Sequence, residues 1–209
     1  MALTILVTGF GPFPGAPFNP TGLLVKRLAR LRRPSLANAK IITHVFPTSY
    51  TAVDRDLPRL IARYKPDALL MFGLATRART LRIETRARNA LALLPDAGGQ
   101  SLRRTTIAPG IPAALAVPTP TRRLLAAVRA ARVPAALSRD AGRYLCNYLC
   151  WRAAEAVAKS NGPRLAAFVH VPNIAWTARQ PTKRRRLRLA DLTRAGSALL
   201  AAVASACHV

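Results

Sequence analysis

Acidic residues are scarce in this chain of 209 residues, which carries eight aspartates and glutamates against 33 lysines and arginines. Histidine and cysteine are also rare, at three residues each. No group of them has the spacing that a set of metal ligands shows in a sequence. The sequence therefore predicts no bound metal and no cofactor.

The cysteines and the apolar segments exclude two further classes of protein. Three cysteines are an odd number without the spacing of a disulfide framework, and the first residues do not resemble a signal peptide. We therefore expect a cytoplasmic protein. The Ala/Leu-rich segment 198–206 is too short to cross a bilayer, so we expect no membrane partner.

The excess of basic residues gives a formal net charge of +25, which would attract nucleic acid or anionic membrane without specificity. The charge is spread along the chain apart from the run Lys183-Arg184-Arg185-Arg186, and no aromatic residues are interleaved to stack on bases. We interpret it as a solvated basic surface and expect no specific nucleic-acid partner. A protein that binds anions through this run and the scattered arginines is an alternative.

Short apolar runs alternate with segments of helical periodicity, which is typical of an α/β fold. Hydrophobic residues make up 51% of the chain, enough for a large core. We predict a single domain over residues 1–209, a three-layer α/β/α sandwich around a twisted sheet that is mostly parallel or mixed. Strands are expected at 3–8, 40–46, 68–72 and 165–171, with β-compatible sequence at 79–94. Helices are expected from 20 until Pro34 and at 49–64, 119–132, 142–159 and 187–206, and a mobile loop at 108–120.

The sequence around Cys146 predicts a thiol where a helix begins. Gly142 supplies a turn, and Cys146 follows it on the expected first turn of the helix. The free amides and the dipole of a helix N-terminus favour the thiolate, which is the nucleophilic form. Judged alone, however, an intracellular cysteine is more often a small buried hydrophobe. The residues available as its partners decide between these interpretations.

Two residues can complete a cysteine nucleophile: His170, at the end of the strand 165–171, and Glu84, in the segment 81–89. A thiol needs a base for its proton, and the imidazole needs a carboxylate that fixes its tautomer and stabilises its charge. In open α/β sheets such groups gather where strands end. From the residues alone, a catalytic and a structural role stay equally open for both.

The other candidates for this chemistry have simpler interpretations. We expect His44 to be a strand residue, His208 a solvated tail residue and Cys150 a core residue. Glu155 is expected to pair with a basic residue of its own helix.

Several short motifs occur in the order and with the separations of one known family. They are Thr8-Gly9-Phe10-Gly11-Pro12-Phe13, Asn19-Pro20-Thr21, Pro47-Thr48-Ser49-Tyr50, Gly73-Leu74-Ala75, Glu84-Thr85-Arg86-Ala87-Arg88-Asn89, Ala141-Gly142 with Leu145-Cys146-Asn147, and Val169-His170-Val171-Pro172. Through them the chain resembles the pyroglutamyl peptidase I family, cysteine omega-peptidases that remove an N-terminal pyroglutamate from peptides.

The resemblance implies a triad in which Cys146 is the nucleophile, His170 the general base and later acid, and Glu84 the group that orients His170. It also implies a pyroglutamyl thioester intermediate and peptides with an N-terminal pyroglutamate as partners, and it allows a homo-oligomer. The substrate-binding residues that it implies are Phe10, Phe13, Asn19, Thr48, Leu74, Tyr144 and Leu145.

These positions suit the chemistry of pyroglutamate, which is flat and uncharged. Phe10 and Phe13 would pack against the lactam ring in an apolar slot. Backbone groups of Tyr144 and Leu145 would bond to the lactam amide, and the amide of Cys146 is a natural oxyanion donor.

The chain departs from the family pattern near the expected site, and two of these departures concern residues around the pocket. Leu91-Ala92-Leu93-Leu94-Pro95-Asp96 stands where the family commonly has D-A-R-I-P-D, so Leu93 replaces an arginine associated with the oxyanion region. Leu74 stands where a glutamine is frequent. The alternative is therefore a pseudo-enzyme that retains the triad, or a related amidohydrolase with an altered substrate pocket.

Overall fold

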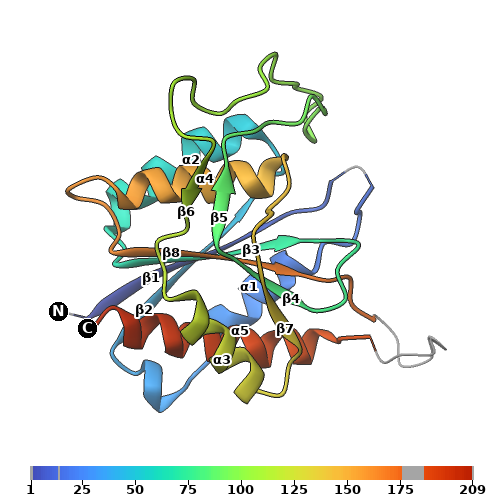
Figure 1. Cartoon of the computed structure of the whole chain (residues 1–209). Coiled ribbons are helices and arrows are strands. Elements are labelled where there is room, and N and C mark those ends of the chain that lie inside the picture. The colour runs from blue at the N-terminus through green and yellow to red at the C-terminus, as the bar shows by residue number, and fades with distance from the viewer. Residues whose placement is uncertain (1, 14, 176–185, 209) are drawn as a thin grey trace.

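The computed structural model describes residues 2–13, 15–175 and 186–208. Within these ranges six strands form one sheet in the order β2-β1-β3-β8-β4-β7 (Figure 1). Strands β2, β1, β3 and β8 run parallel, whereas β4 is antiparallel to β8 and parallel to β7. The strands are β1 (Leu3–Phe10), β2 (Ala39–Phe46), β3 (Ala68–Leu74), β4 (Leu81–Glu84), β7 (Ala135–Ser138) and β8 (Leu165–Val171).

Helices cover both faces of the sheet (Figure 1). One face carries α2 (Tyr50–Tyr64) and α4 (Leu145–Val157), and the other carries α1 (Pro20–Ala29), α3 (Thr121–Ala130) and α5 (Leu189–Ala206). A 3-10 helix spans Pro34–Leu36, and β5 (Arg86–Arg88) pairs antiparallel with β6 (Ala114–Ala116) beside α4. The predicted three-layer α/β/α fold with a mixed, mostly parallel sheet is confirmed.

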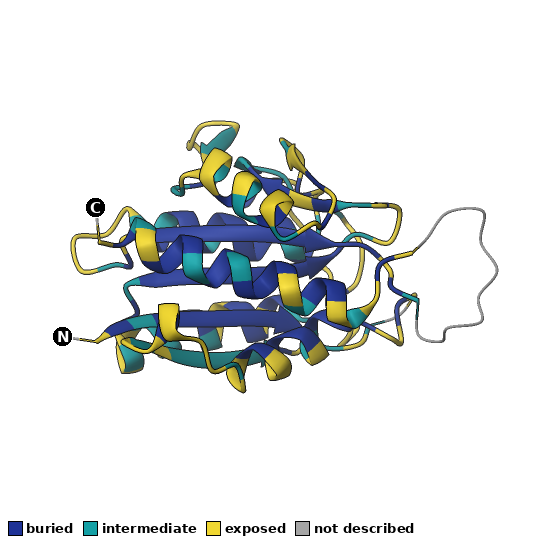
Figure 2. Ribbon diagram, turned by 90° about the horizontal axis from the view of Figure 1, so that it is seen from below, coloured by how far each residue is buried: buried dark blue, intermediate teal, exposed yellow. Residues whose placement is uncertain are grey.

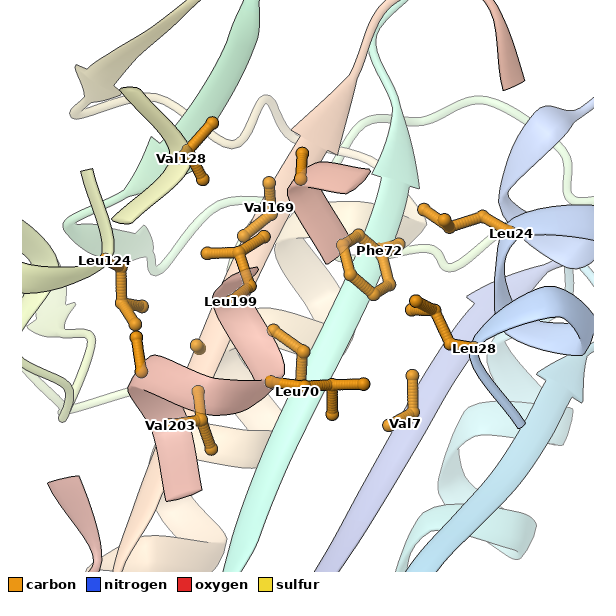
Figure 3. Packing of buried hydrophobic residues seen from close by; sticks show 14 of the residues in the cluster. Val7, Leu24, Leu28, Leu70, Phe72, Leu124, Val128, Val169, Leu199 and Val203 are labelled. Carbon is orange, nitrogen blue, oxygen red and sulfur yellow. The ribbon is translucent and has the colours of Figure 1, made fainter. Parts of the chain in front are cut away.

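Alternating side chains on the central strands build a core on each side of the sheet. On β3, Leu70 packs toward α1, α3 and α5, where it meets Leu199 and Val203 of α5 (Figure 3). The adjacent Leu69 and Met71 of β3 face α2 and α4 instead. Figure 2 shows the strands buried between helices whose outward sides are exposed.

The same alternation decides where His170 points. On β8, Val169 and Val171 belong to the core beneath α1, α3 and α5, and Phe168 belongs to the core beneath α2 and α4. Because successive side chains of a strand point to opposite faces, His170 lies on the α2/α4 face.

Two predicted helix boundaries are wrong, and backbone geometry explains both. Helix α1 ends at Ala29 and does not continue to Pro34, because a proline disfavours helical geometry in the preceding residue; Arg33 is extended. Helix α4 begins at Leu145 and not at Gly142, whose φ of +83° is incompatible with a right-handed helix. Cys146 still lies on the first turn, as predicted.

The sequence prediction also misses two strands. The expected loop 108–120 contains β6, and β7 was not expected within 135–138. Both strands are three or four residues long and rich in alanine, so they lack the β-branched and aromatic residues that mark a strand. The β-compatible segment 79–94 forms only β4 and β5.

Two further expectations concern the basic run 183–186 and the absence of a membrane-spanning segment. Most of the basic run 183–186 lies outside the described residues, which resume at Arg186. Among the helices that the structure describes, none has both the length and the hydropathy needed to cross a bilayer.

Candidate active site

Three residues on neighbouring strands form the floor of the candidate site. Gly73 of β3 is paired in register with His170 of β8, and β4 brings Glu84 to the other side of β8. His170 Nδ1 lies 2.8 Å from Glu84 Oε1. The three residues therefore form a row across the α2/α4 face of the sheet.

Cys146 reaches this floor from the first turn of α4. Gly73 leaves the space that the sulfur occupies, because a Cβ atom on Gly73 would lie only 2.7 Å from Cys146 Sγ. The sulfur also lies close enough to the His170 ring for the two groups to interact electrostatically. Cys146, His170 and Glu84, which are far apart in the sequence, thus converge in the order that a catalytic triad requires.

His170 is held in its charged form by its two neighbours. Burial opposes protonation of the ring, but the Cys146 sulfur and the Glu84 carboxylate outweigh it and raise the pKa of His170 to about 9. Glu84 is fully buried, and its second oxygen, Oε2, has no hydrogen-bond partner among the described residues. The surroundings of His170 therefore favour its protonated form.

Asn147 ties the start of α4 to the chain that follows Glu84. Its Oδ1 accepts the N–H of Arg88 (2.8 Å), and its Nδ2 donates to the carbonyls of Arg88 and Ala90 (2.8 and 3.0 Å). The side chain is fully buried. Sequence reasoning missed this positioning residue, and the only signal for it is a polar amide directly after Cys146.

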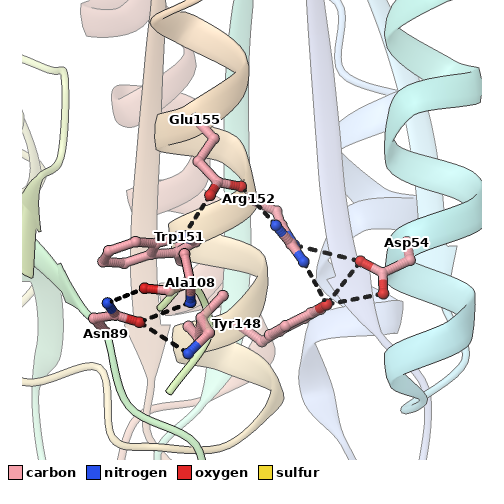
Figure 4. Close-up of polar contacts among 8 residues, drawn as sticks. Asp54, Asn89, Ala108, Tyr148, Trp151, Arg152 and Glu155 are labelled. Carbon is pink, nitrogen blue, oxygen red and sulfur yellow. Dashed lines mark hydrogen bonds and ion pairs between the residues drawn. The ribbon is translucent and has the colours of Figure 1, made fainter. Parts of the chain in front are cut away.

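A second set of polar contacts holds α4 against α2 (Figure 4). Tyr148 Oη donates to both carboxylate oxygens of Asp54 at 2.8 Å, and it accepts from Arg152 Nη2 at 2.9 Å. Arg152 also pairs with Glu155 at 2.8 Å, which confirms the expected pairing of Glu155 within its helix. The helix that carries Cys146 is therefore held by polar contacts on two sides.

A cavity of about 460 Å³ opens in front of Cys146 and His170. Glu84 lies behind His170 and does not line it. All of the predicted substrate-binding residues line this cavity: Phe10, Phe13, Asn19, Thr48, Leu74, Tyr144 and Leu145. A larger hollow of about 900 Å³ between α2 and α4 is lined by none of the triad residues.

Asn19 and Thr48 line the cavity, but their polar atoms hold the loop after β1. Asn19 Nδ2 and Thr48 Oγ1 both donate to the carbonyl of Gly11, at 3.0 and 3.2 Å. Asn19 Oδ1 accepts the N–H of Thr21 and so caps α1. These contacts fix the wall of the cavity to which Phe13 belongs.

The N-terminus of α4 also points at the cavity. The first backbone bond of the helix runs from Tyr148 N to the carbonyl of Tyr144 (3.0 Å). The N–H groups of 145–147 precede it and have no carbonyl within the helix to bond. An anion that forms beside Cys146 would meet these donors.

The two departures from the family pattern differ in their relation to the cavity. Leu74 lines it. Leu93 and Leu94 are 64% and 60% exposed and do not line it.

The cysteine and the histidines for which we expected no catalytic role lie away from the cavity or beneath it. Cys150 is buried in the core, as predicted, and burial raises its pKa well above the ordinary value. His44 lies on β2 and pairs with Asp56 at 3.6 Å, and His208 is exposed. Among the described residues no group of three or more His, Cys, Asp and Glu could hold a metal ion.

Known proteins share this architecture. The family profile described as pyroglutamyl peptidase matches residues 3–203. The pyrrolidone-carboxylate peptidase of Thermococcus kodakarensis is 34% identical over 171 residues, 81% of each chain, and that of Pyrococcus furiosus is 32% identical over 173 residues, 82% of each chain. The structure of a mutant pyrrolidone carboxyl peptidase from Pyrococcus furiosus has a TM-score of 0.86 at 26% identity, covering 97% of this chain and 99% of that one. The pyrrolidone carboxyl peptidase from Thermococcus litoralis has a TM-score of 0.87 at 26% identity, with 97% and 94% covered.

Replacing Gly73 by alanine should separate Cys146 from His170, because the new Cβ would displace the sulfur or the Phe168 ring. An ordinary cysteine is only a few per cent thiolate at pH 7, so alkylation of Cys146 by iodoacetamide should slow by roughly tenfold or more. Gly22→Ala is the matched control, since its Cβ would have its nearest neighbour at 3.5 Å. Unchanged alkylation in a folded Gly73→Ala variant would contradict the described geometry.

The imidazole of His170 should titrate near pH 9, and the midpoint should fall in Cys146→Ser, which removes the sulfur that contributes most to raising the pKa. Because the folded pKa lies above the unfolded value of 6.5, protonated His170 contributes stability that is full below pH 6.5 and is lost as the pH rises through about 9. Proton NMR of the histidine ring signals measures the midpoint, with exposed His208 as internal reference. A midpoint that is the same in both proteins would rule out the sulfur contact.

Proposed function

This chain belongs to the pyroglutamyl peptidase family, and we propose that Cys146, His170 and Glu84 perform the family's reaction in it. The chain is a cysteine peptidase that removes an N-terminal pyroglutamate from peptides through an acyl-enzyme. One observation carries the assignment of the residues. The sulfur, the imidazole and the carboxylate stand in line at the bottom of a cavity that the predicted binding residues surround.

The pyroglutamyl ring binds between the aromatic side chains of the β1 wall. Phe10 and Phe13 offer apolar surface to a flat, uncharged lactam, and Leu74 adds to it. The backbone of Tyr144 and Leu145, at the start of α4, supplies polar partners for the lactam amide. A cavity of about 460 Å³ has room for the ring and the beginning of the next residue.

Acylation begins with the Cys146 thiolate. Its sulfur attacks the carbonyl carbon that joins pyroglutamate to the next residue, and the carbonyl oxygen becomes an oxyanion. The N–H of Cys146 and its neighbours at the helix N-terminus stabilise that charge. Protonated His170 then gives its Nε2 proton to the leaving amine, the C–N bond breaks, and the shortened peptide departs from a pyroglutamyl thioester.

Deacylation reverses the role of His170. The neutral imidazole takes a proton from water, and the resulting hydroxide attacks the thioester carbon. The C–S bond breaks, free pyroglutamate is released, and the Cys146 thiolate and the His170 imidazolium are restored. Glu84 bonds to Nδ1 throughout, so it keeps Nε2 directed at the reacting atoms and stabilises the ring whenever it is charged.

Peptides with an N-terminal pyroglutamate are the proposed partners, and the cytoplasm is the proposed location. The nucleophile must stay a reduced thiol, and the three cysteines in the described residues are free. A single chain supplies the triad and the whole cavity lining, so the proposed reaction needs no residue from a second copy.

Cys146→Ala should abolish release of the fluorescent amine from a pyroglutamyl aminocoumarin, with turnover falling on the order of 1000-fold or more because the nucleophile is lost. Cys207→Ala is the matched control, since Cys207 is a buried free cysteine that packs in the core on the opposite face of the sheet. Circular dichroism verifies that both variants are folded.

The outcome separates the proposal from its alternative. Release that persists in folded Cys146→Ala would refute the assigned nucleophile. A wild-type protein that releases no amine, although Cys146 alkylates rapidly at neutral pH, would favour the retained triad with an altered pocket.

A further inference from the structure

Three arginines surround the opening of the cavity in front of Cys146. Arg77 follows β3, Arg82 lies on β4, and Arg143 precedes α4. All three line the cavity, and all three are exposed. Arg77 and Arg82 are five residues apart in the sequence, and the fold brings the distant Arg143 to the same opening.

The register of β4 against β8 places Arg82 beside His170. The two residues are direct partners in the antiparallel pair, and such partners project to the same face of a sheet. Arg82 is also two residues before Glu84 and shares its face. Glu84 lies buried behind His170, whereas the exposed Arg82 extends to the cavity opening.

The backbone of Arg143 is held in place on both sides. The N–H of Ala92 donates to its carbonyl (2.6 Å), and the N–H of the preceding Gly142 donates to Asp140 Oδ1 (3.0 Å). Helix α4 begins two residues later and carries Cys146. The cation of Arg143 is therefore attached to a fixed part of the cavity wall.

The sheet order assigns Arg82 to one side of Cys146, and Arg77 lies in the connection that leads from β3 to β4. Phe10 and Phe13 belong to the β1 side of the cavity, Cys146 stands above β3, and Arg82 lies on β4, beyond β8. A lactam seated on the β1 side sends its leaving amine toward His170 and β4. The leaving segment of the substrate then passes the arginines.

The positive charge at this opening has no partner among the residues that the structure describes. None of the three guanidinium groups forms a hydrogen bond or an ion pair with the described residues. Asp140 is the one carboxylate among the described lining residues apart from the triad, and it already bonds to Arg88 Nη1 (3.3 Å) and to the N–H of Gly142 (3.0 Å). The arginines are therefore available to a substrate.

We propose that Arg77, Arg82 and Arg143 bind a carboxylate on the residue that follows pyroglutamate, and so make the enzyme selective for peptides with a negative charge there. The guanidinium fork matches a carboxylate, and a cleft lined by one sign of charge concentrates oppositely charged ligands. This inference rests on the proposed function. An exposed pair changes binding by up to about fivefold, so three arginines acting together should give roughly tenfold selectivity at low salt.

The test compares peptide amides that differ only after pyroglutamate. At low salt, kcat/KM for pyroglutamyl-Glu-amide should exceed that for the isosteric pyroglutamyl-Gln-amide by roughly tenfold, mostly through KM, and pyroglutamyl-Lys-amide should be poorest. The difference should shrink at high salt, which screens exposed charges. A second comparison measures kcat/KM for pyroglutamyl-Ala with a free C-terminal carboxylate and for its amide. It shows whether the arginines bind a main-chain carboxylate as well as a side-chain carboxylate.

A matched pair of triple variants keeps the net charge equal. Replacing Arg77, Arg82 and Arg143 by glutamine should bring the Glu-to-Gln ratio close to one. Replacing the exposed Arg30, Arg32 and Arg33, at the end of α1 away from Asn19, should leave the ratio as in the wild type.

The outcomes separate this inference from the function on which it rests. Equal kcat/KM for the Glu, Gln and Lys amides, with all of them cleaved, overturns the arginine selectivity and leaves the peptidase intact. Equal loss of selectivity in both triple variants also overturns it, because overall charge would then be the cause. If no pyroglutamyl amide is cleaved, the proposed function itself fails.

Discussion

The site depends on the space above Gly73, where a single Cβ atom would come within 2.7 Å of the Cys146 sulfur. The register of the sheet puts this glycine beside His170, so a sulfur seated above it is within reach of the imidazole. The far side of the same ring meets Glu84 on the next strand. The absence of a side chain on Gly73 thus sets the position of Cys146 relative to His170, and the sulfur together with the buried carboxylate raises the pKa of His170.

Much of the remaining sequence motif serves to hold this arrangement. Asn147 joins the start of α4 to the chain after Glu84, and Tyr148 and Arg152 join the same helix to α2. Asn89 accepts the N–H groups of 107 and 108, which fixes the loop that leads to β6 (Figure 4). These side chains contact no reacting atom. Their hydrogen bonds hold the helix and the loop in place. Such support matters for a reacting group on a helix, because a small displacement of the reacting atoms lowers the catalytic rate strongly.

The sequence predicts the layers, the central strands and the three residues that the fold brings together as Cys146, His170 and Glu84, because apolar periodicity and short ordered motifs are local signals. It predicts poorly what depends on pairing between distant segments. The alanine-rich strands β6 and β7 form because β5 and β4 offer them partners, and residue propensity does not reveal that. The gathering of Arg77, Arg82 and Arg143 likewise follows from strand register, which is invisible in a chain that is basic throughout. Leu93 could be aligned with a family arginine, but only the fold reveals that its side chain faces solvent.

The central claim is that the sulfur above Gly73 forms a covalent bond to the pyroglutamyl group during turnover. Acid quenching in the steady state, followed by mass spectrometry of the digested protein, tests this claim directly. The account predicts a mass increase of one pyroglutamyl group on the peptide that contains Cys146, lost again when the substrate is exhausted. Turnover that yields no acylated protein at any quench time, whether the substrate is limiting or in excess, would contradict this claim. So would an acyl group on a residue other than Cys146.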